Sequence, residues 1–266
     1  MREHEMNAAT GWLVGLAIFF SVIALPTIGL AQEQPARKLV WSEDFKRPGR
    51  PDPAKWTYEE GFVRNHEVQY YTRDRRENAR VDGGHLTIEA RKEPYVKAEV
   101  TSASLTSRQS WTYGRIEVKA KIPTGKGTWP AIWMLGTNIT EVGWPACGEI
   151  DIMENVGFDP EKIHCTVHTR NAAGEHASKG NSVTADKPYD TFHVYAMDWD
   201  AKRMLLTFDG KTVLTYANDG VNPWPFDKPQ YLILNLAIGG EWGGQKGVDE
   251  SIYPSRFLIQ YVHVYQ

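Results

Sequence analysis

Short stretches of alternating apolar and polar residues, separated by turn residues, recur along the chain from residue 38 onward. Alternation with a period of two indicates a β-strand with one buried face. Asp209-Gly210 and Asp82-Gly83-Gly84 are hairpin signals between such stretches. More than ten strands and no convincing helix predict an all-β domain of two large packed sheets, with mobile loops at 46–65 and 171–188. The predicted strands cover 38–45, 85–91, 114–122, 131–135, 148–155, 163–169, 192–198, 203–208, 212–216, 231–238 and 257–265.

The stretch at 148–154, which reads GEIDIME, breaks this alternation. Glu149 and Asp151 share one face of the expected strand, whereas Glu154 is out of phase and would share the face of the isoleucines. A carboxylate is poorly placed on a packed apolar face. One extra residue, a β-bulge at Ile152-Met153, would return Glu154 to the face of the other two acids. We therefore predict three carboxylates in a row on one face.

Paired carboxylates on one surface suit the hydrolysis of a glycosidic bond. The two groups lie roughly 5–5.5 Å apart in retaining enzymes and roughly 6.5–9.5 Å apart in inverting ones. Glutamate side chains that lean inward close much of the gap between Glu149 and Glu154, which favours retention. Asp151 between them adds like-charge repulsion, which raises the pKa of a neighbouring acid. A solvated acidic face or a calcium loop is the alternative, but the apolar neighbours of these acids disfavour it.

Composition narrows the class of partner. The chain is 41% hydrophobic and 24% charged, which is ordinary for a globular domain. Its 10 Trp and 12 Tyr suit a sugar-binding surface, although large all-β cores also use aromatic residues. A formal net charge of -3 argues against nucleic acid as the main partner.

The run at 148–154 resembles the signature of glycoside hydrolase family 16, in the bulged form of laminarinase-type β-1,3-glucanases. The resemblance extends over residues 38–266 and implies a β-jelly-roll sandwich with a concave substrate cleft. It also implies a retaining endo-β-1,3-glucanase that acts on laminarin-like glucans and on mixed-linkage β-1,3-1,4-glucan. Further blocks that resemble the family lie at 39–45, 69–72, 111–117, 129–136, 166–168 and 234–240.

The resemblance implies a role for each acid. Glu149 corresponds to the nucleophile, Glu154 to the general acid/base and Asp151 to the residue that tunes them. His168 lies on the next expected strand with a parity that allows it to face Asp151, and we assign it a supporting role. His164, Cys165 and His168 would alternatively form a metal cluster, but Cys165 is expected to point away from both histidines.

Aromatic and polar residues are expected to bind the substrate. Trp129 and Trp133, four residues apart on one strand face, correspond to tryptophans that line the glycone side of the cleft. Trp144 and Trp242 lie in expected loops at the cleft rim. The polar candidates are Asn65 and Arg115. The chain also departs from the family at position 104, where Ser104 replaces an arginine of many relatives and would weaken one sugar contact.

No cofactor is expected for catalysis, but the resemblance implies that a structural calcium ion could bind. The positions concerned are Asp44, Gly84 and Gln260, and Gln260 stands where relatives have an aspartate. The missing aspartate makes calcium binding a weaker expectation than the acid run.

The N-terminus predicts export. Residues 12–31 form an apolar run that ends in small residues, so residues 1–31 read as a signal peptide and residues 32–266 as one catalytic domain. A retained membrane anchor is the alternative. We expect a secreted or periplasmic monomer, with no membrane contact after signal removal. Cys147 and Cys165 are too few for a disulfide framework and lie on opposite strand faces, which predicts two free thiols.

Three other functions stay open from the sequence. The protein would be a family member that cleaves a galactan such as agarose or carrageenan, or a non-catalytic carbohydrate-binding protein with the same fold. Transfer of the sugar to another sugar, in place of water, would use the same retaining intermediate. The partner in each case is a polysaccharide.

Overall fold

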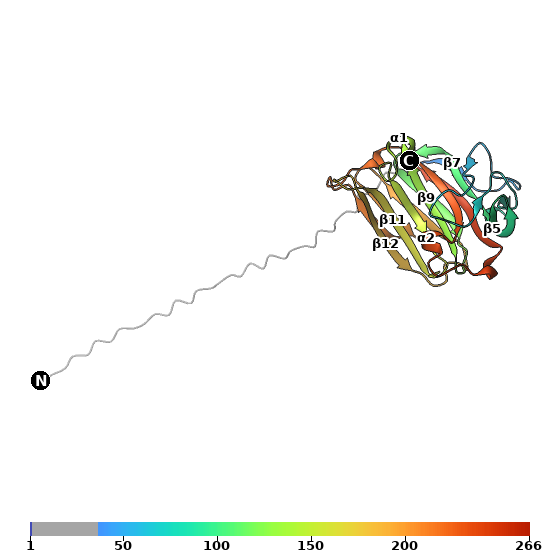
Figure 1. Cartoon of the computed structure of the whole chain (residues 1–266). Helices are drawn as coiled ribbons and strands as arrows, with labels where there is room; N and C mark the ends of the chain where they lie inside the picture. Colours follow the sequence, from blue (N-terminus) through green and yellow to red (C-terminus); the bar gives the residue numbers. More distant parts are fainter. Residues whose placement is uncertain (2–36) are drawn as a thin grey trace. The chain divides into compact units, whose positions relative to one another are not determined.

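Two β-sheets pack face to face within residues 37–266 (Figure 1). The computed structural model describes Met1 and residues 37–266, so the predicted signal peptide lies almost entirely outside the described residues. Within the described part of the chain, no helix has the length and apolar character needed to cross a membrane.

Seventeen strands and four short helical segments follow one another along the described chain. They are β1 (Leu39–Glu43), β2 (Trp56–Tyr58), β3 (Tyr70–Tyr71), β4 (Ala79–Asp82), β5 (His85–Tyr95), β6 (Ala98–Ser102), β7 (Ser104–Trp111), β8 (Gly114–Lys121), β9 (Thr128–Gly136), α1 (Ile139–Val142), β10 (Glu149–Glu154), β11 (Lys162–Arg170), β12 (His176–Thr184), β13 (His193–Trp199), β14 (Arg203–Phe208), β15 (Lys211–Ala217), η1 (Pro225–Asp227), β16 (Gln230–Ile238), α2 (Gly240–Gly243), η2 (Glu250–Ile252) and β17 (Ser255–Tyr265).

The strands form a ten-stranded and a seven-stranded sheet. The main path of the larger sheet is β15-β14-β13-β8-β17-β5-β6-β3, with β1 paired to β17 and β4 to β5. The smaller sheet has the order β12-β11-β10-β9-β16-β7-β2. All pairs are antiparallel except β3 with β6. This arrangement confirms the predicted jelly-roll sandwich.

Alternating side chains from both sheets fill the space between them. In the smaller sheet Ile150, Ile152 and Met153 of β10 are fully buried in the main core, and in the larger sheet Val118 and Val262 belong to the same core. Strand residues one position away point to the opposite face. The face of the seven-stranded sheet that is turned away from this core is called the acid-bearing face below, because Glu149, Asp151 and Glu154 project from it.

Both hairpin predictions are confirmed. Asp209 and Gly210 connect β14 to β15 with φ angles of 46° and 76°, and Gly83 and Gly84 connect β4 to β5 with φ angles of 56° and 77°. Positive φ at both central residues is the requirement of the tight turn whose twist matches antiparallel strands.

The predicted mobile loop at 171–188 is wrong. Residues His176–Thr184 form β12, which pairs with β11 at nine consecutive positions from Arg170↔His176 to Lys162↔Thr184. β12 is an edge strand whose residues are polar on both faces, so it lacks the apolar alternation that would have marked it. The predicted loop at 46–65 likewise contains the short strand β2. The other unpredicted strands are β3, β4, β6 and β7.

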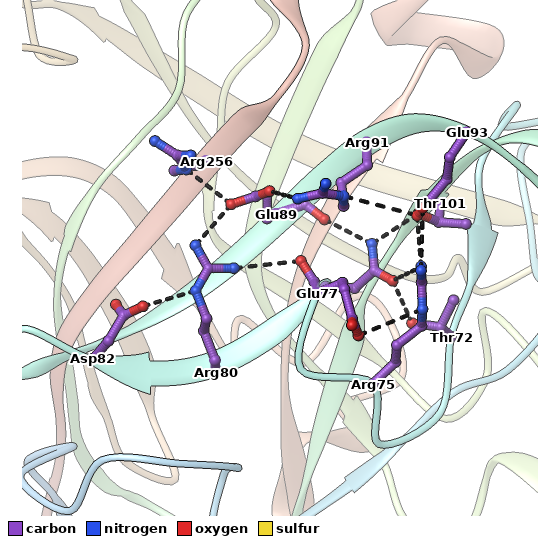
Figure 2. Close-up of polar contacts among 11 residues, drawn as sticks. Thr72, Arg75, Glu77, Arg80, Asp82, Glu89, Arg91, Glu93, Thr101 and Arg256 are labelled. Atoms are coloured by element: carbon purple, nitrogen blue, oxygen red, sulfur yellow. Dashed lines mark hydrogen bonds and ion pairs between the residues drawn. The ribbon is translucent and has the colours of Figure 1, made fainter.

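A network of ion pairs lies on the larger sheet, around β4, β5 and β6 (Figure 2). The Glu89 side chain is 1% exposed and accepts hydrogen bonds from Arg80 at 2.7 Å and Arg256 at 2.8 Å. Nearby, Arg75 donates hydrogen bonds to Glu93 from Nη1 and Nη2, at 2.5 and 3.1 Å. The network joins strands that are distant in sequence and belongs to a different sheet from the acids.

Candidate active site

The predicted bulge is present in β10. Asp151 of β10 pairs with Trp133 of β9, and Met153 pairs with the adjacent Ile132. Ile152 is therefore an extra residue without a partner on β9. The register against β11 shifts between the same positions, Asp151 and Glu154. Glu154 then pairs with Ala131, which shares the face of Trp133. The extra residue therefore places all three acids on the acid-bearing face, as predicted.

Each of the two glutamates accepts a hydrogen bond from a tryptophan indole. Nε1 of Trp129 donates to Oε1 of Glu154 at 2.9 Å, and Nε1 of Trp144 donates to Oε2 of Glu149 at 2.8 Å. Trp129 comes from the neighbouring strand β9, whereas Trp144 comes from the loop between β9 and β10. The indole groups fix one oxygen of each carboxylate and leave its other oxygen for chemistry.

His168 lies beside Glu149 and Asp151, as predicted. It pairs with Glu149 across β10 and β11. Its Nε2 lies 3.1 Å from Oδ2 of Asp151 and 3.9 Å from Oε1 of Glu149. The contact with Asp151 has the distance of an ion pair, but Oδ2 of Asp151 has no hydrogen bond of good geometry. A charge on His168 would therefore act mainly through space on both carboxylates.

Burial raises the pKa values of all three acids, and repulsion between the acids adds to the rise at Asp151 and Glu154. Burial, and then the charges of Asp151 and Glu149, raise the pKa of Glu154 well above its ordinary value, against the Trp129 hydrogen bond and a smaller effect of His168. Burial also raises the pKa of Glu149, but the charge of His168 and the hydrogen bond from Trp144 oppose it. Burial and the charge of Glu149 raise the pKa of Asp151 well above its ordinary value. Glu154 is thus placed to hold a proton, and Glu149 to ionise.

Trp133 forms part of the floor of the acid-bearing face. It is 6% exposed, donates a hydrogen bond to Oδ1 of Asn235 at 2.7 Å, and has the Arg64 guanidinium 4.8 Å from its ring centroid. Asn235 in turn donates to the Tyr71 hydroxyl at 3.0 Å. Arg64 covers the Trp133 ring, so this ring offers less open surface to a sugar than the resemblance implied.

Three further predicted binding residues lie at the same face. The indole of Trp144 is 47% exposed at its rim. Trp242 lies on the short helix α2, with its ring centroid 5.7 Å from that of Trp129. Asn65 is exposed in the loop before β3, and its backbone oxygen accepts a hydrogen bond from the Glu241 amide at 2.9 Å. Trp144 contacts Glu149, Trp242 contacts the ring of Trp129, and Asn65 contacts the helix that carries Trp242.

The structure does not bring Arg115, which was expected to bind substrate, to the acid-bearing face. Arg115 lies on β8 of the ten-stranded sheet, where its guanidinium binds Asp198 at 2.6 Å and Glu117 at 2.8 Å. Its neighbours Ile116 and Val118 point into the core, so Arg115 projects from the opposite side of the sandwich. Its sequence block belongs to a structural ion-pair cluster.

The residues predicted for calcium do not form an oxygen cage around Asp44. Oδ1 of Asp44 lies 2.7 Å from Nε2 of His263, and Oδ2 lies 3.4 Å from Nζ of Lys46. Gly84 lies in the β4–β5 turn, and Gln260 is exposed on β17. A carboxylate that faces a lysine and a histidine does not fit a calcium ligand in this arrangement.

Both cysteines are free and buried, as predicted. The Cys165 thiol points into the core, where it donates to the Ile152 carbonyl at 3.2 Å, and burial raises its pKa to about 12. This orientation removes the alternative of a metal cluster with His164 and His168, because the sulfur lies on the other face of β11.

Sequence reasoning missed two residues at this face, Arg64 and His176. Arg64 binds Glu59, which also accepts a hydrogen bond from Ser104 at 2.6 Å. A guanidinium thus reaches the floor from another segment, although Ser104 replaces the family arginine. His176 lies 2.9 Å from His168 across β11 and β12. No pattern marked His176, because β12 itself was not predicted.

Comparisons with known proteins agree with this geometry. The family model described as glycosyl hydrolases family 16 matches residues 66–261. A beta-glucanase of Rhodothermus marinus is 43% identical, covering 100% of this chain and 97% of the relative. The structure of the laminarinase from Rhodothermus marinus has a TM-score of 0.82 at 45% identity, covering 87% of this chain and 98% of that chain. SCLam, a non-specific endo-beta-1,3(4)-glucanase, has a TM-score of 0.81 at 46% identity, covering 88% and 92% respectively. The chain therefore belongs to family 16 of the glycosyl hydrolases and is a glycoside hydrolase.

Proposed function

We propose that the protein is a retaining endo-β-1,3-glucanase that cleaves laminarin-like chains and also mixed-linkage β-1,3-1,4-glucan. The observation that carries the proposal is the unequal environment of two glutamates on one face. Burial and the charges of two neighbouring acids raise the pKa of Glu154 well above its usual range, whereas at Glu149 burial is opposed first by His168 and then by the Trp144 hydrogen bond. The relatives named above, a laminarinase and an endo-β-1,3(4)-glucanase, support the choice of glucan.

In the first step Glu154 acts as the general acid and Glu149 as the nucleophile. Because Oε1 of Glu154 accepts the Trp129 indole hydrogen bond, its proton resides on Oε2. That proton passes to the glycosidic oxygen as the bond to the anomeric carbon breaks. A carboxylate oxygen of Glu149 bonds to the anomeric carbon and gives a covalent glycosyl-enzyme.

In the second step the roles of Glu154 reverse. Its carboxylate removes a proton from water, the water oxygen bonds to the anomeric carbon, and the bond to Glu149 breaks. Repulsion between Asp151 and Glu154 favours the protonated form of Glu154 before each turnover. His168 partly balances the negative charge of Glu149 and Asp151.

The first test replaces each glutamate by its amide. Glu149→Gln and Glu154→Gln should each lower reducing-sugar release from laminarin by at least about 10²-fold, the usual cost of losing an acid/base or a nucleophile. Glu141→Gln, at an exposed glutamate on α1, is the matched control and should keep wild-type activity. A loss of less than about tenfold in both site variants would contradict the assignment.

The second test identifies the substrate and the stereochemistry. NMR of the early products from laminarin should show the β-anomer, as retention requires. A panel with mixed-linkage glucan, agarose and carrageenan should give products from the glucans alone. Cleavage of a galactan, or binding without turnover, would favour one of the two other functions raised by the sequence.

Export from the cell is part of the proposal. A leader cut after Ala31 would leave a mature chain that starts at Gln32. Mass spectrometry of the N-terminal peptide from the culture medium or periplasm should find this terminus. A chain that retains residues 12–31 in the membrane fraction would contradict it.

A further inference from the structure

A second histidine, His176, lies on the solvent side of His168, next to the run of acids formed by Glu149, Asp151 and Glu154 (the acid run). His176 of β12 lies beside His168 of β11, with Nε2 of His176 2.9 Å from Nδ1 of His168. The two rings are stacked, with centroids 5.2 Å apart and planes 16° from parallel. On its other side, Nε2 of His168 lies 3.1 Å from Oδ2 of Asp151. Asp151, His168 and His176 thus follow one another from the buried carboxylate to the exposed strand.

The short distance between the rings limits how many protons the pair can hold. Two nitrogens 2.9 Å apart share one proton, because a second proton would place two N–H groups against each other. The other two positions for a proton are Nε2 of His168, which lies 3.1 Å from Oδ2 of Asp151 without a hydrogen bond of good geometry, and Nδ1 of His176. The pair therefore carries at most one positive charge while this contact lasts.

Trp144 lies between His176 and Glu149. Its ring centroid lies 4.7 Å from that of His176, and its indole donates to Oε2 of Glu149. His176 thus contacts both the residue beside Asp151 and the residue that holds Glu149.

We propose that His176 is a positioning residue for catalysis. It holds the His168 ring beside Asp151 and the Trp144 ring beside Glu149, and it lets the histidine pair take up one positive charge next to these acids. The inference rests on the proposed roles of Glu149 and Asp151. His176 itself touches no reacting atom.

The charged groups around His176 determine the direction of the effect. Arg170 lies opposite it on β11, Glu175 precedes it on the chain, and His168 stacks on it. A positive charge on either His168 or His176 lowers the pKa of Glu149 against the larger effect of burial. Without His176 the single charge can no longer be shared between two rings and is held less readily, so the pKa of Glu149 rises and the nucleophile ionises at a higher pH.

The experiment compares His176→Phe, His176→Ala and the control Lys179→Ala. Phenylalanine keeps a ring against Trp144 but holds no proton, whereas Lys179 lies on the same strand with its side chain on the opposite face. The acidic limb of the kcat/KM profile on laminarin should move up by about half a pH unit or more in both His176 variants. kcat should fall by up to about tenfold with little change in KM, and Lys179→Ala should match the wild type.

A wild-type pH profile in His176→Phe would overturn the proposal and leave His176 as a packing group. A measurement on the unmodified protein covers the case in which the variants fail to fold. Nitrogen-15 NMR of the two imidazoles should show one shared proton and a single charge. Two independent titrations, each ending in a full positive charge, would overturn it. This readout needs no substrate, so it stays decisive if the Glu149→Gln test contradicts the proposed function.

Discussion

At the scale of single residues, the site separates two chemically identical side chains by what surrounds them. Glu149 and Glu154 each accept one indole hydrogen bond, at 2.8 and 2.9 Å. Burial raises the pKa of both. They differ because His168, 3.9 Å from Glu149, is the main effect that opposes burial there, whereas the charges of Asp151 and Glu149 raise the pKa of Glu154 further. Unequal environments of this kind assign the acid and the nucleophile.

Removal of one indole donor tests this assignment at Glu154. Trp129→Phe takes away a hydrogen bond that lowers the pKa of Glu154, so that pKa should rise further. The general acid then stays protonated to higher pH, and the alkaline limb of the kcat/KM profile should move upward. kcat/KM at neutral pH should fall by about 2- to 10-fold, in line with one net hydrogen bond.

Trp133→Phe is the matched control for Trp129→Phe. It removes a hydrogen bond from the same strand face, but that bond goes to the amide of Asn235. Its alkaline limb should stay where the wild type has it. Equal shifts in both variants would mean that the effect comes from packing of the floor.

At the scale of elements, ion pairs and hydrogen bonds stabilise the larger sheet at β5 and β6. Arg75 donates two hydrogen bonds to the Glu93 carboxylate, and the Thr101 hydroxyl donates a third to it at 2.5 Å. The Arg75 hydrogen bonds lower the pKa of Glu93 to about 2. A carboxylate with a lowered folded-state pKa stabilises the fold above its unfolded-state pKa and loses that contribution as pH falls toward the folded-state value.

Glu93→Gln should therefore destabilise the protein by about 1–3 kcal/mol at pH 7. The difference from the wild type should shrink between the ordinary pKa of 4.5 and a pH of about 2. Urea unfolding followed across this range measures it. Glu77→Gln, at an exposed partner 3.6 Å from Arg75, should cost less than about 0.5 kcal/mol. A pH-independent difference would show that the cost is one of packing.

At the scale of the whole molecule, the sandwich keeps its two cysteines apart from each other and from solvent. Both thiols are free and 1% exposed or less. Burial raises the pKa of each thiol, so the reactive thiolate form is scarce at neutral pH. The core between the sheets, not a covalent cross-link, accounts for the stability of the described domain.

Reducing agent should accordingly leave the melting temperature unchanged, within about 1 °C. A thiol reagent should titrate two groups in denaturant and almost none in the native protein. Scanning calorimetry with and without dithiothreitol checks the first expectation. A drop of several degrees would reveal a disulfide and contradict the structure.

Local pattern sufficed wherever a residue's role depends on its own strand. The alternation around Ile150 predicted the core face of β10, and the phase error at Glu154 predicted the bulge. The same parity argument placed His168 beside Asp151 and kept Cys165 in the core. It failed for β12, because an edge strand that is polar on both faces has no apolar side to mark it.

The sequence by itself determined the sandwich, the three acids on one face and the family, since each follows from periodicity or from a contiguous motif. Only the tertiary structure decided which distant residues meet the acids. Arg64 reaches Trp133 from a loop, His176 reaches His168 from an unpredicted strand, and Arg115 lies on the other sheet. Such contacts depend on strand order and register, which pair residues far apart in the chain and leave no local trace in the pattern of either segment.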